Sequence, residues 1–206
     1  NSENVMNRVK RFYGRKLYNK CKVVYTGIET KKFYHKKGEF FLSVSRLDRL
    51  KRIDVIIKAF KQMPEEKLYI TSTGPEEDRL KKLAEGCDNI KFLGAVSDKR
   101  LLGLYAACKA VISANIDEDL GLSAIECQAA GKPAITVREG GFVETVVENK
   151  TGLFFEPNPG SLISAIKRFN KTTWNINVIR KNAKKYDIRV FVKKIRQIIK
   201  ETANSK

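Results

Sequence analysis

Apolar residues in the middle of the chain alternate between two patterns. Short runs of consecutive apolar, β-prone residues are each followed by a segment in which apolar residues recur at spacings of three and four. The first pattern is typical of a buried strand, and the second is typical of one face of a helix. The strand-like runs lie at residues 39–46, 67–73, 89–96, 110–115, 132–137 and 151–156.

Each strand-like run leads into its helix through a short turn. After the first run, Ile53, Ile56, Ile57 and Phe60 fall on one helical face. Parallel strands need such crossover helices, and a run that is apolar throughout indicates a strand covered on both faces. Six alternations of this kind predict an α/β fold, a doubly wound parallel sheet of the Rossmann-like type.

The two ends of the chain differ from this middle in charge. Residues 1–37 hold eleven Lys and Arg against two acids, and residues 171–206 also hold eleven against two, whereas residues 38–170 hold nineteen of each. Residues 2–13 suit a short capped helix, and residues 173–202 suit two basic helices. We therefore divide the chain into a leading connection at 1–37, an α/β domain at 38–170 and basic C-terminal helices at 171–206.

The net charge of +18 does not indicate a nucleic-acid partner. A nucleic-acid binder usually carries its basic patch on the folded face that reads the bases, but here the excess lies on the flanks. No aromatic RNA-binding strand, zinc-ligand spacing or helix-turn-helix pattern is present. Two alternatives remain open for the flanks, namely contact with an anionic membrane surface and a solvated lysine-rich surface.

The cysteines and the single histidine exclude some kinds of site. The four cysteines lie far apart without a CxxC pair, which is typical of reduced thiols in a cytoplasmic protein. His35 is the only histidine, so a histidine-centred metal site is excluded. No apolar run is long enough to span a bilayer, and no signal-peptide pattern is present. We expect a cytoplasmic protein, with a peripheral position at the inner face of the membrane left open.

Ligands of doubly wound sheets bind beyond the carboxyl ends of the strands. Arg46 closes the first strand there, and Lys51 follows at the start of the next helix. A guanidinium and an ammonium group in these places can straddle a diphosphate. The alternative is a surface pair bonded to Asp48 or Asp54, and spacing alone does not decide between them.

The stretch "DEDLGLSAIECQAAGKP" at 117–133 places an acid on each side of a helix start. Gly121 begins the helix and leaves its first amides open to an anion. Glu118 precedes that point and Glu126 follows about one turn later, and carboxylates accept hydrogen bonds from sugar hydroxyls. The pattern suits a sugar–diphosphate–nucleoside ligand, although Glu118 alone could be an ordinary acid near a helix N-terminus.

The order of "SVSRLDRLKR", "TSTGPEEDRL", "IKFLGAVSDKRLLGLY", "EDLGLSAIECQAAGKPAIT", "GGFVETV" and "TGLFFEP" resembles the C-terminal half of GT-B glycosyltransferases. The specific similarity is to glycosyltransferase family 4, also called group 1, over about residues 2–170. Its most specific element is the E-x7-E pattern of Glu118 and Glu126 with Gly121 between them, together with Arg46 and Lys51 upstream.

This resemblance implies a role for each matching position. Arg46 and Lys51 would hold the donor diphosphate, Glu118 would contact the transferred sugar, and Glu126 would bind the ribose. Arg46, Lys51 and Glu118 would be the catalytic residues. The remaining expected donor contacts are the base-binding loop at Val96 and Ser97, the helix start at Gly121, Leu122 and Ser123, and the glycines Gly74 and Gly141. For the pair Gly140–Gly141, ligand contact and turn geometry stay open as alternatives.

The activity implied is transfer of a hexose from a nucleotide-sugar donor to an acceptor hydroxyl with retention of configuration. The individual residues within these motifs are similar to those of mannosyltransferases, which points to GDP-mannose as the donor. We expect no metal or other cofactor, because cations and helix amides can stabilise the leaving diphosphate. The acceptor site would belong to an N-terminal GT-B domain absent from this chain, which would then bind donor without turning over alone.

The alternatives to this function are a GT-B-like sugar-nucleotide epimerase and a non-catalytic nucleotide- or membrane-binding module. The chain also departs from the family pattern at several positions. Leu120 replaces the usual Phe, Ser45 and Ser72 replace common glycines, and a Pro-Ser pair is missing before the acidic stretch. A serine in a glycine position needs a compatible φ.

Overall fold

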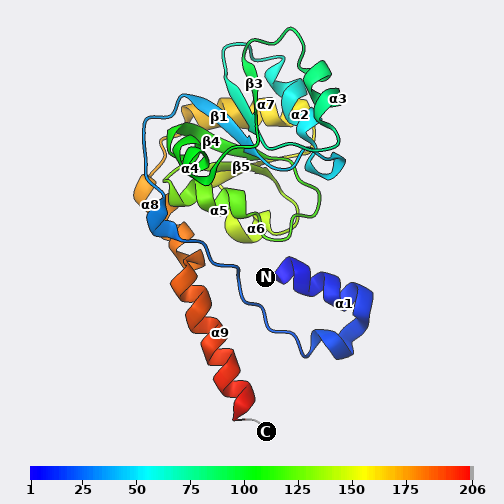
Figure 1. Ribbon diagram of the computed structural model, residues 1–206, viewed down its shortest axis with the longest axis vertical. Helices are drawn as coiled ribbons and strands as arrows, with labels where there is room; N and C mark the ends of the chain where they lie inside the picture. The colour runs from blue at the N-terminus through cyan, green and yellow to red at the C-terminus, as the bar shows by residue number, and fades with distance from the viewer. Residues whose placement is uncertain (205–206) are drawn as a thin grey trace.

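The computed structural model describes residues 1–204 and contains a six-stranded, all-parallel sheet with the strand order β3-β2-β1-β4-β5-β6. Figure 1 shows the helices packed around it. The predicted doubly wound α/β fold is confirmed, and every strand overlaps its predicted run. The strands are β1 (Phe40–Val44), β2 (Leu68–Thr71), β3 (Ile90–Gly94), β4 (Cys108–Ser113), β5 (Ala134–Val137) and β6 (Gly152–Phe155).

The winding direction reverses between β1 and β4. From β1 the chain proceeds outward to β2 and β3, and it then returns to the other side of β1 to build β4, β5 and β6. The loops after β1 and β4 therefore diverge at the carboxyl edge, which is the place where open α/β sheets bind ligands.

Helices connect the strands and form both ends of the described chain. The predicted helix after β5 is only four residues long, because Val146 already has extended dihedral angles. The α-helices are α1 (Glu3–Tyr18), α2 (Ile53–Phe60), α3 (Glu77–Leu83), α4 (Asp98–Ala107), α5 (Leu122–Ala129), α6 (Phe142–Thr145), α7 (Pro159–Lys171), α8 (Ile176–Ala183) and α9 (Ile188–Ala203). Short 3-10 turns lie at η1 (Thr30–Lys32), η2 (Arg49–Lys51) and η3 (Lys184–Tyr186).

The sheet is buried on both faces, which accounts for its uninterrupted apolar runs. Phe41 makes edge contacts with Phe60 of α2 and Phe169 of α7, while its neighbour Leu42 belongs to the opposite cluster with Tyr105 of α4. Phe41 and Leu42 are both fully buried. Since side chains alternate across a strand, each strand must be apolar at consecutive positions.

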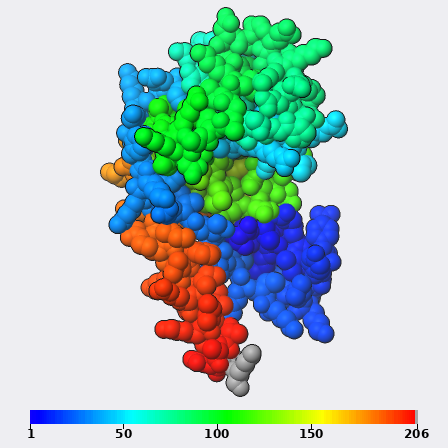
Figure 2. Space-filling view, viewed as in Figure 1, coloured from blue at the N-terminus to red at the C-terminus, as the bar shows by residue number. Residues whose placement is uncertain are grey.

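The basic ends lie beside the sheet and not within it. In Figures 1 and 2, α1 and α9 extend from the same side of the molecule, and neither helix has a buried residue. The extended segment between α1 and β1 is joined to the start of α9, because Ile28 bonds to the backbone of Tyr186 and Ile188. By contrast, α8 packs against α5 through buried Ile179 and Ala183.

The division of the chain at residues 37 and 170 stays a prediction, and residues 205 and 206 of its last part lie outside the described residues. Within the described residues, none of the helices combines the length and the hydropathy that a membrane span requires.

Candidate functional site

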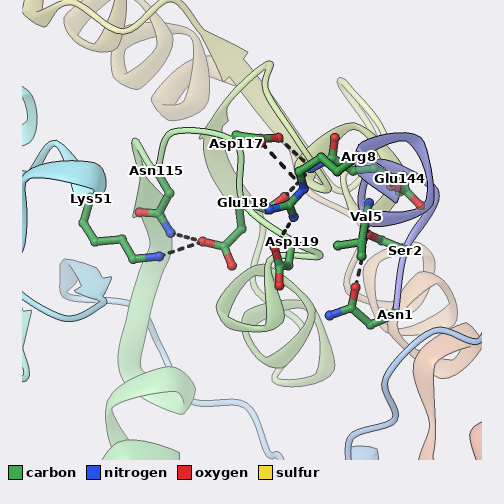
Figure 3. A network of polar contacts seen from close by, with 11 residues as sticks. Asn1, Ser2, Val5, Arg8, Lys51, Asn115, Asp117, Glu118, Asp119 and Glu144 are labelled. Carbon is green, nitrogen blue, oxygen red and sulfur yellow. Dashed lines mark hydrogen bonds and ion pairs between the residues drawn. The ribbon is translucent and has the colours of Figure 1, made fainter. Parts of the chain in front are cut away.

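The loops after β1 and β4 bring a cation and an acid together. Lys51, the last residue of η2, places its Nζ atom 3.0 Å from Oε2 of Glu118. Figure 3 shows the two side chains pointing toward each other across the edge of the sheet. Both groups are partly shielded, with exposed side-chain fractions of 27% and 19%, so their attraction is stronger than that of a fully solvated pair.

The alternative partners considered for the two cations are occupied elsewhere. The Asp48 carboxylate accepts a hydrogen bond from the backbone of Leu50 at 3.0 Å, and Asp54 pairs with Lys58. Arg46 is exposed, and no acid among residues 1–204 pairs with its guanidinium group. The structure therefore leaves Arg46 free to meet an anion.

Glu118 is held from its backbone as well as its side chain. Asn115, which is buried, donates from Nδ2 to Glu118 Oε2 at 2.5 Å. The Gly141 amide donates to the Glu118 carbonyl at 2.6 Å. A Cβ atom at Gly141 would lie 2.4 Å from the Leu120 Cα atom, and one at Gly140 would lie 2.5 Å from the Glu118 nitrogen. The glycine pair thus permits close backbone approach, which accounts for it without a ligand contact.

Gly121 ends the same loop in a left-handed conformation, with φ +84°. A Cβ atom there would lie 2.6 Å from the Phe142 ring, so space and backbone both favour glycine. The amides of Leu122 and Ser123 follow in the first turn of α5, where no intrahelical acceptor exists. The N-terminus of α5, which carries partial positive charge, therefore begins four residues after Glu118 in the chain.

Glu126 faces a different hollow from Glu118. Its Oε2 accepts a hydrogen bond of 2.6 Å from the hydroxyl of Tyr105. Burial raises the pKa of Glu126, and the Tyr105 bond partly opposes that shift. The hollow has a volume of about 660 Å³, and its described lining includes Glu126 but none of Arg46, Lys51 and Glu118. The two acids of the E-x7-E pattern thus face different parts of the surface.

The remaining predicted contacts belong to the adjoining loops. Ser97 caps α4 by accepting from the Arg100 amide, and the next residue, Asp98, lines the Glu126 cavity. Gly74 lies so close to the loop of Arg46 that a Cβ atom would be 2.4 Å from the Leu47 carbonyl oxygen. Ser72 has φ +79°, a left-handed conformation that favours glycine. Together these positions surround the carboxyl edge, and their part in binding stays a prediction.

Several residues at this edge escaped the sequence analysis. Arg8 of α1 forms ion pairs with Asp117 and Asp119, on either side of Glu118 (Figure 3). Asn4 donates from Nδ2 to Asp117 Oδ1 at 2.8 Å and to the Glu118 carbonyl at 3.1 Å. No local pattern could reveal contacts over more than a hundred residues, whereas Asn115 could have been noticed as a polar residue directly after a buried strand.

Comparisons with known proteins agree with this architecture. The chain is 26% identical to the alpha-1,3/1,6-mannosyltransferase ALG2 of Mus musculus over 153 residues, which are 65% of this chain and 37% of that protein. It is 29% identical to an uncharacterized glycosyltransferase of Methanocaldococcus jannaschii over 191 residues, which are 81% and 49%. The chain thus spans about half or less of these curated relatives.

Solved structures share the fold. The Anabaena protein Alr3699/HepE, crystallised with UDP and glucose, superimposes with a TM-score of 0.83 at 21% identity, covering 98% of this chain and 62% of that one. At this identity the likeness concerns the fold alone, which is that of GT-B glycosyltransferases.

The family model described as "Glycosyl transferases group 1" matches residues 27–186. That span contains all six strands, both loops of the switch point and both acids of the E-x7-E pattern. The resemblance carried by the motifs is therefore confirmed, and the chain belongs to the glycosyl transferases group 1 family.

Proposed function

We propose that this chain is the donor-binding part of a retaining glycosyltransferase that transfers a hexose from a nucleotide sugar to an acceptor hydroxyl. The observation that carries the proposal is the ion pair of Lys51 with Glu118, in the loop that leads into α5. A cation and open amides suit a diphosphate, and a carboxylate beside them suits the hydroxyls of the attached sugar.

Catalysis in this proposal is electrostatic. When the bond between the sugar and the diphosphate breaks, negative charge accumulates on the departing phosphate oxygens. In this proposal Arg46, Lys51 and the amides of Leu122 and Ser123 would stabilise that charge. Glu118 would hold the transferred sugar, and the scheme uses no metal ion or other cofactor.

The nucleoside would occupy the hollow beside α4. Glu126 would accept hydrogen bonds from the ribose hydroxyls, and the backbone at Val96 and Ser97 would meet the base. We propose GDP-mannose as the donor, because the residues within the motifs resemble those of mannosyltransferases and because mannosyltransferases are among the similar proteins. The alternative outcome is a UDP-sugar donor, because the similar Anabaena protein was crystallised with UDP.

The acceptor site would lie in an N-terminal GT-B domain outside these residues. This proposal is supported by the greater length of the curated relatives, of which the chain spans 37% to 49% in the two cases above. We expect a cytoplasmic protein whose separate chain binds donor without transferring sugar. Detectable glycosyl transfer by the 206 residues alone would contradict that expectation. Contact of the basic flanks with anionic lipid stays a proposal, to be tested by vesicle binding at low and high salt.

Calorimetric titration of the chain with GDP-, UDP- and ADP-sugars tests the proposal directly. One donor should bind, and Arg46→Ala should weaken its binding about tenfold or more, since charge-assisted contacts with phosphate contribute roughly 1.5–3 kcal/mol. Arg49→Ala is the matched control, because that side chain is 86% exposed and pairs with Glu76 instead. Binding of no nucleotide sugar, or equal effects of both substitutions, would refute a donor site at this edge.

A further inference from the structure

The hydroxyl of Tyr105 is placed to control the carboxylate of Glu126. Tyr105 lies in α4 with only 1% of its surface exposed, and its hydroxyl donates to Glu126 Oε2 at 2.6 Å. Among residues 1–204, no other side chain donates a hydrogen bond to this carboxylate. Oε1 therefore has no protein donor in the described chain.

Neighbouring groups hold the Tyr105 ring in place. Phe33, in the segment that leads to β1, meets the ring edge-on with centroids 5.8 Å apart. Leu42 and Val111 belong to the same buried cluster. Close packing of this kind holds the ring in one position, so the place of its hydroxyl oxygen beside Glu126 is set before any ligand arrives.

Tyr105, Glu126 and Phe33 all line the 660 Å³ cavity that also contains Asp98. The hydrogen bond therefore lies at the wall of a hollow and not in the closed core. A carboxylate held through one oxygen at such a wall can offer the other oxygen to a pair of hydroxyl donors.

We propose that Tyr105 is a positioning residue that presents Glu126 to the ribose hydroxyls of the nucleotide. The inference rests on the proposed donor function, because it concerns how that site recognises its nucleoside. Tyr105 occupies Oε2, and Oε1 is left to accept from the ribose. Tyr105 itself does not touch the ligand in this proposal.

The charges around Glu126 explain why it needs such a partner. Burial disfavours the ionised form of Glu126, and to a lesser extent Asp98 of α4 repels its charge, so both raise its pKa. Glu29 and Lys32 of the leading segment and Lys99 of α4 also line the cavity. The Tyr105 hydroxyl acts in the opposite direction and lowers the pKa. Removing it should therefore extend protonation of Glu126 to higher pH.

The experiment is calorimetric titration of the 206-residue chain with GDP and with 2′,3′-dideoxy-GDP, and with the corresponding uridine pair in parallel. Tyr105→Phe should weaken binding of the ribonucleotide about tenfold, the usual scale for a hydrogen bond to a charged group. Binding of the dideoxy nucleotide should change little. The pH below which ribonucleotide affinity is lost should also move upward, which a purely structural role would not produce.

Tyr69→Phe provides the matched control, because Tyr69 stacks on Phe40 and its hydroxyl has no partner in the described chain. Glu126→Gln completes a double-mutant cycle with Tyr105→Phe. In the Glu126→Gln variant, adding Tyr105→Phe should not further reduce the preference for the ribonucleotide over the dideoxy nucleotide, because the two residues act through one carboxylate.

The outcomes separate this inference from the proposed function. If Glu126→Ala removes ribose preference but Tyr105→Phe leaves it unchanged, or weakens both nucleotides equally, the positioning role is refuted. If the wild-type chain binds no nucleotide, the donor function itself fails and the inference fails with it. If nucleotide binds but Glu126→Ala changes nothing, Glu126 does not hold the ribose and the inference fails alone.

Discussion

Arg8 of α1 contacts Asp119, one residue after Glu118 in the loop that follows β4. Its Nε atom also lies 3.7 Å from Asp117 Oδ2, so one guanidinium group reaches the acids on both sides of Glu118. The α1 backbone adds a second attachment, because the amides of Glu3 and Asn4 both donate to Glu144 at 2.9 Å. A helix at the start of the chain therefore restrains a loop at the carboxyl edge of the sheet.

This restraint predicts that Arg8→Ala loosens the 115–121 loop. The pairs are partly exposed, with 33% of Arg8 and 53% of Asp119 accessible, so the expected loss is modest. About 0.2–1 kcal/mol per exposed pair corresponds to amide exchange roughly 1.4 to 5 times faster in that loop. Hydrogen–deuterium exchange measures this. Arg15→Ala, an exposed residue of the same helix, is the control, and equal loop exchange in the two variants would contradict the restraint.

Glu118→Gln should affect two ligands in opposite directions. In the free chain the Glu118 carboxylate lies 3.0 Å from the Lys51 ammonium and offsets part of its charge. The neutral amide leaves Lys51 more attractive to a diphosphate, so a free nucleoside diphosphate should bind a few-fold more tightly. A nucleotide sugar should bind about tenfold less tightly, since a charged acceptor for its hydroxyls is lost. Weakening of both ligands to the same degree would show that Glu118 has no specific relation to the sugar.

Gly141→Ala should destabilise the chain even though its φ is an ordinary −67°. The added Cβ would meet the backbone of Leu120 and Asp119 at 2.4 Å, and backbone cannot move aside as a side-chain tip can. We expect a loss of about 1–3 kcal/mol, as for overpacking in a core, measured by urea denaturation. Gly160→Ala in α7 is the control: the nearest atom given for its Cβ is Oδ1 of the capping residue Asn158, at 3.6 Å, so it should be neutral or slightly stabilising. A neutral Gly141→Ala would mean that the loop can shift.

Asp187→Asn tests the attachment of α9. Asp187 caps α9, and bonds from the Arg189 guanidinium, the Thr30 hydroxyl and the Arg189 amide hold its pKa well below the ordinary value. An acid with a depressed pKa stabilises the fold above its unfolded pKa, about 3.9, and loses that contribution as pH falls toward the lower folded value. Asn caps a helix as well as Asp, so the expected cost of about 1 kcal/mol at pH 7 comes from weakening the charge-assisted bonds, and it should be smaller below pH 4.

Urea denaturation at pH 3 to 7 measures this difference, with Asp88→Asn as control because Asp88 is exposed in a turn. A cost for Asp187→Asn that stays constant across this range would exclude the carboxylate charge as its cause.

Much of the fold could be predicted from local pattern. The runs that became β1 to β6 are apolar at consecutive positions because a parallel strand buries both faces, and the four- and three-residue spacings after them mark helices. Local pattern was not sufficient at Val146. The apolar spacing predicts that the helix continues there, but α6 ends after four residues. Sheet topology also predicted that the loops of Arg46, Lys51 and Glu118 lie at one edge, and the Lys51–Glu118 ion pair agrees with this, whereas the binding roles of these residues stay predictions.

Most contacts of the residues at that edge were decided by tertiary structure. Asn115 is a local partner of Glu118, but Lys51 and Gly141 are distant from it along the chain, and the partner of Glu126 comes from α4. Local sequence determines which elements form, since periodicity and dihedral preference act over a few residues. The pairing of particular side chains depends on how those elements pack. Packing brings together residues whose separation along the chain gives no sign of a contact.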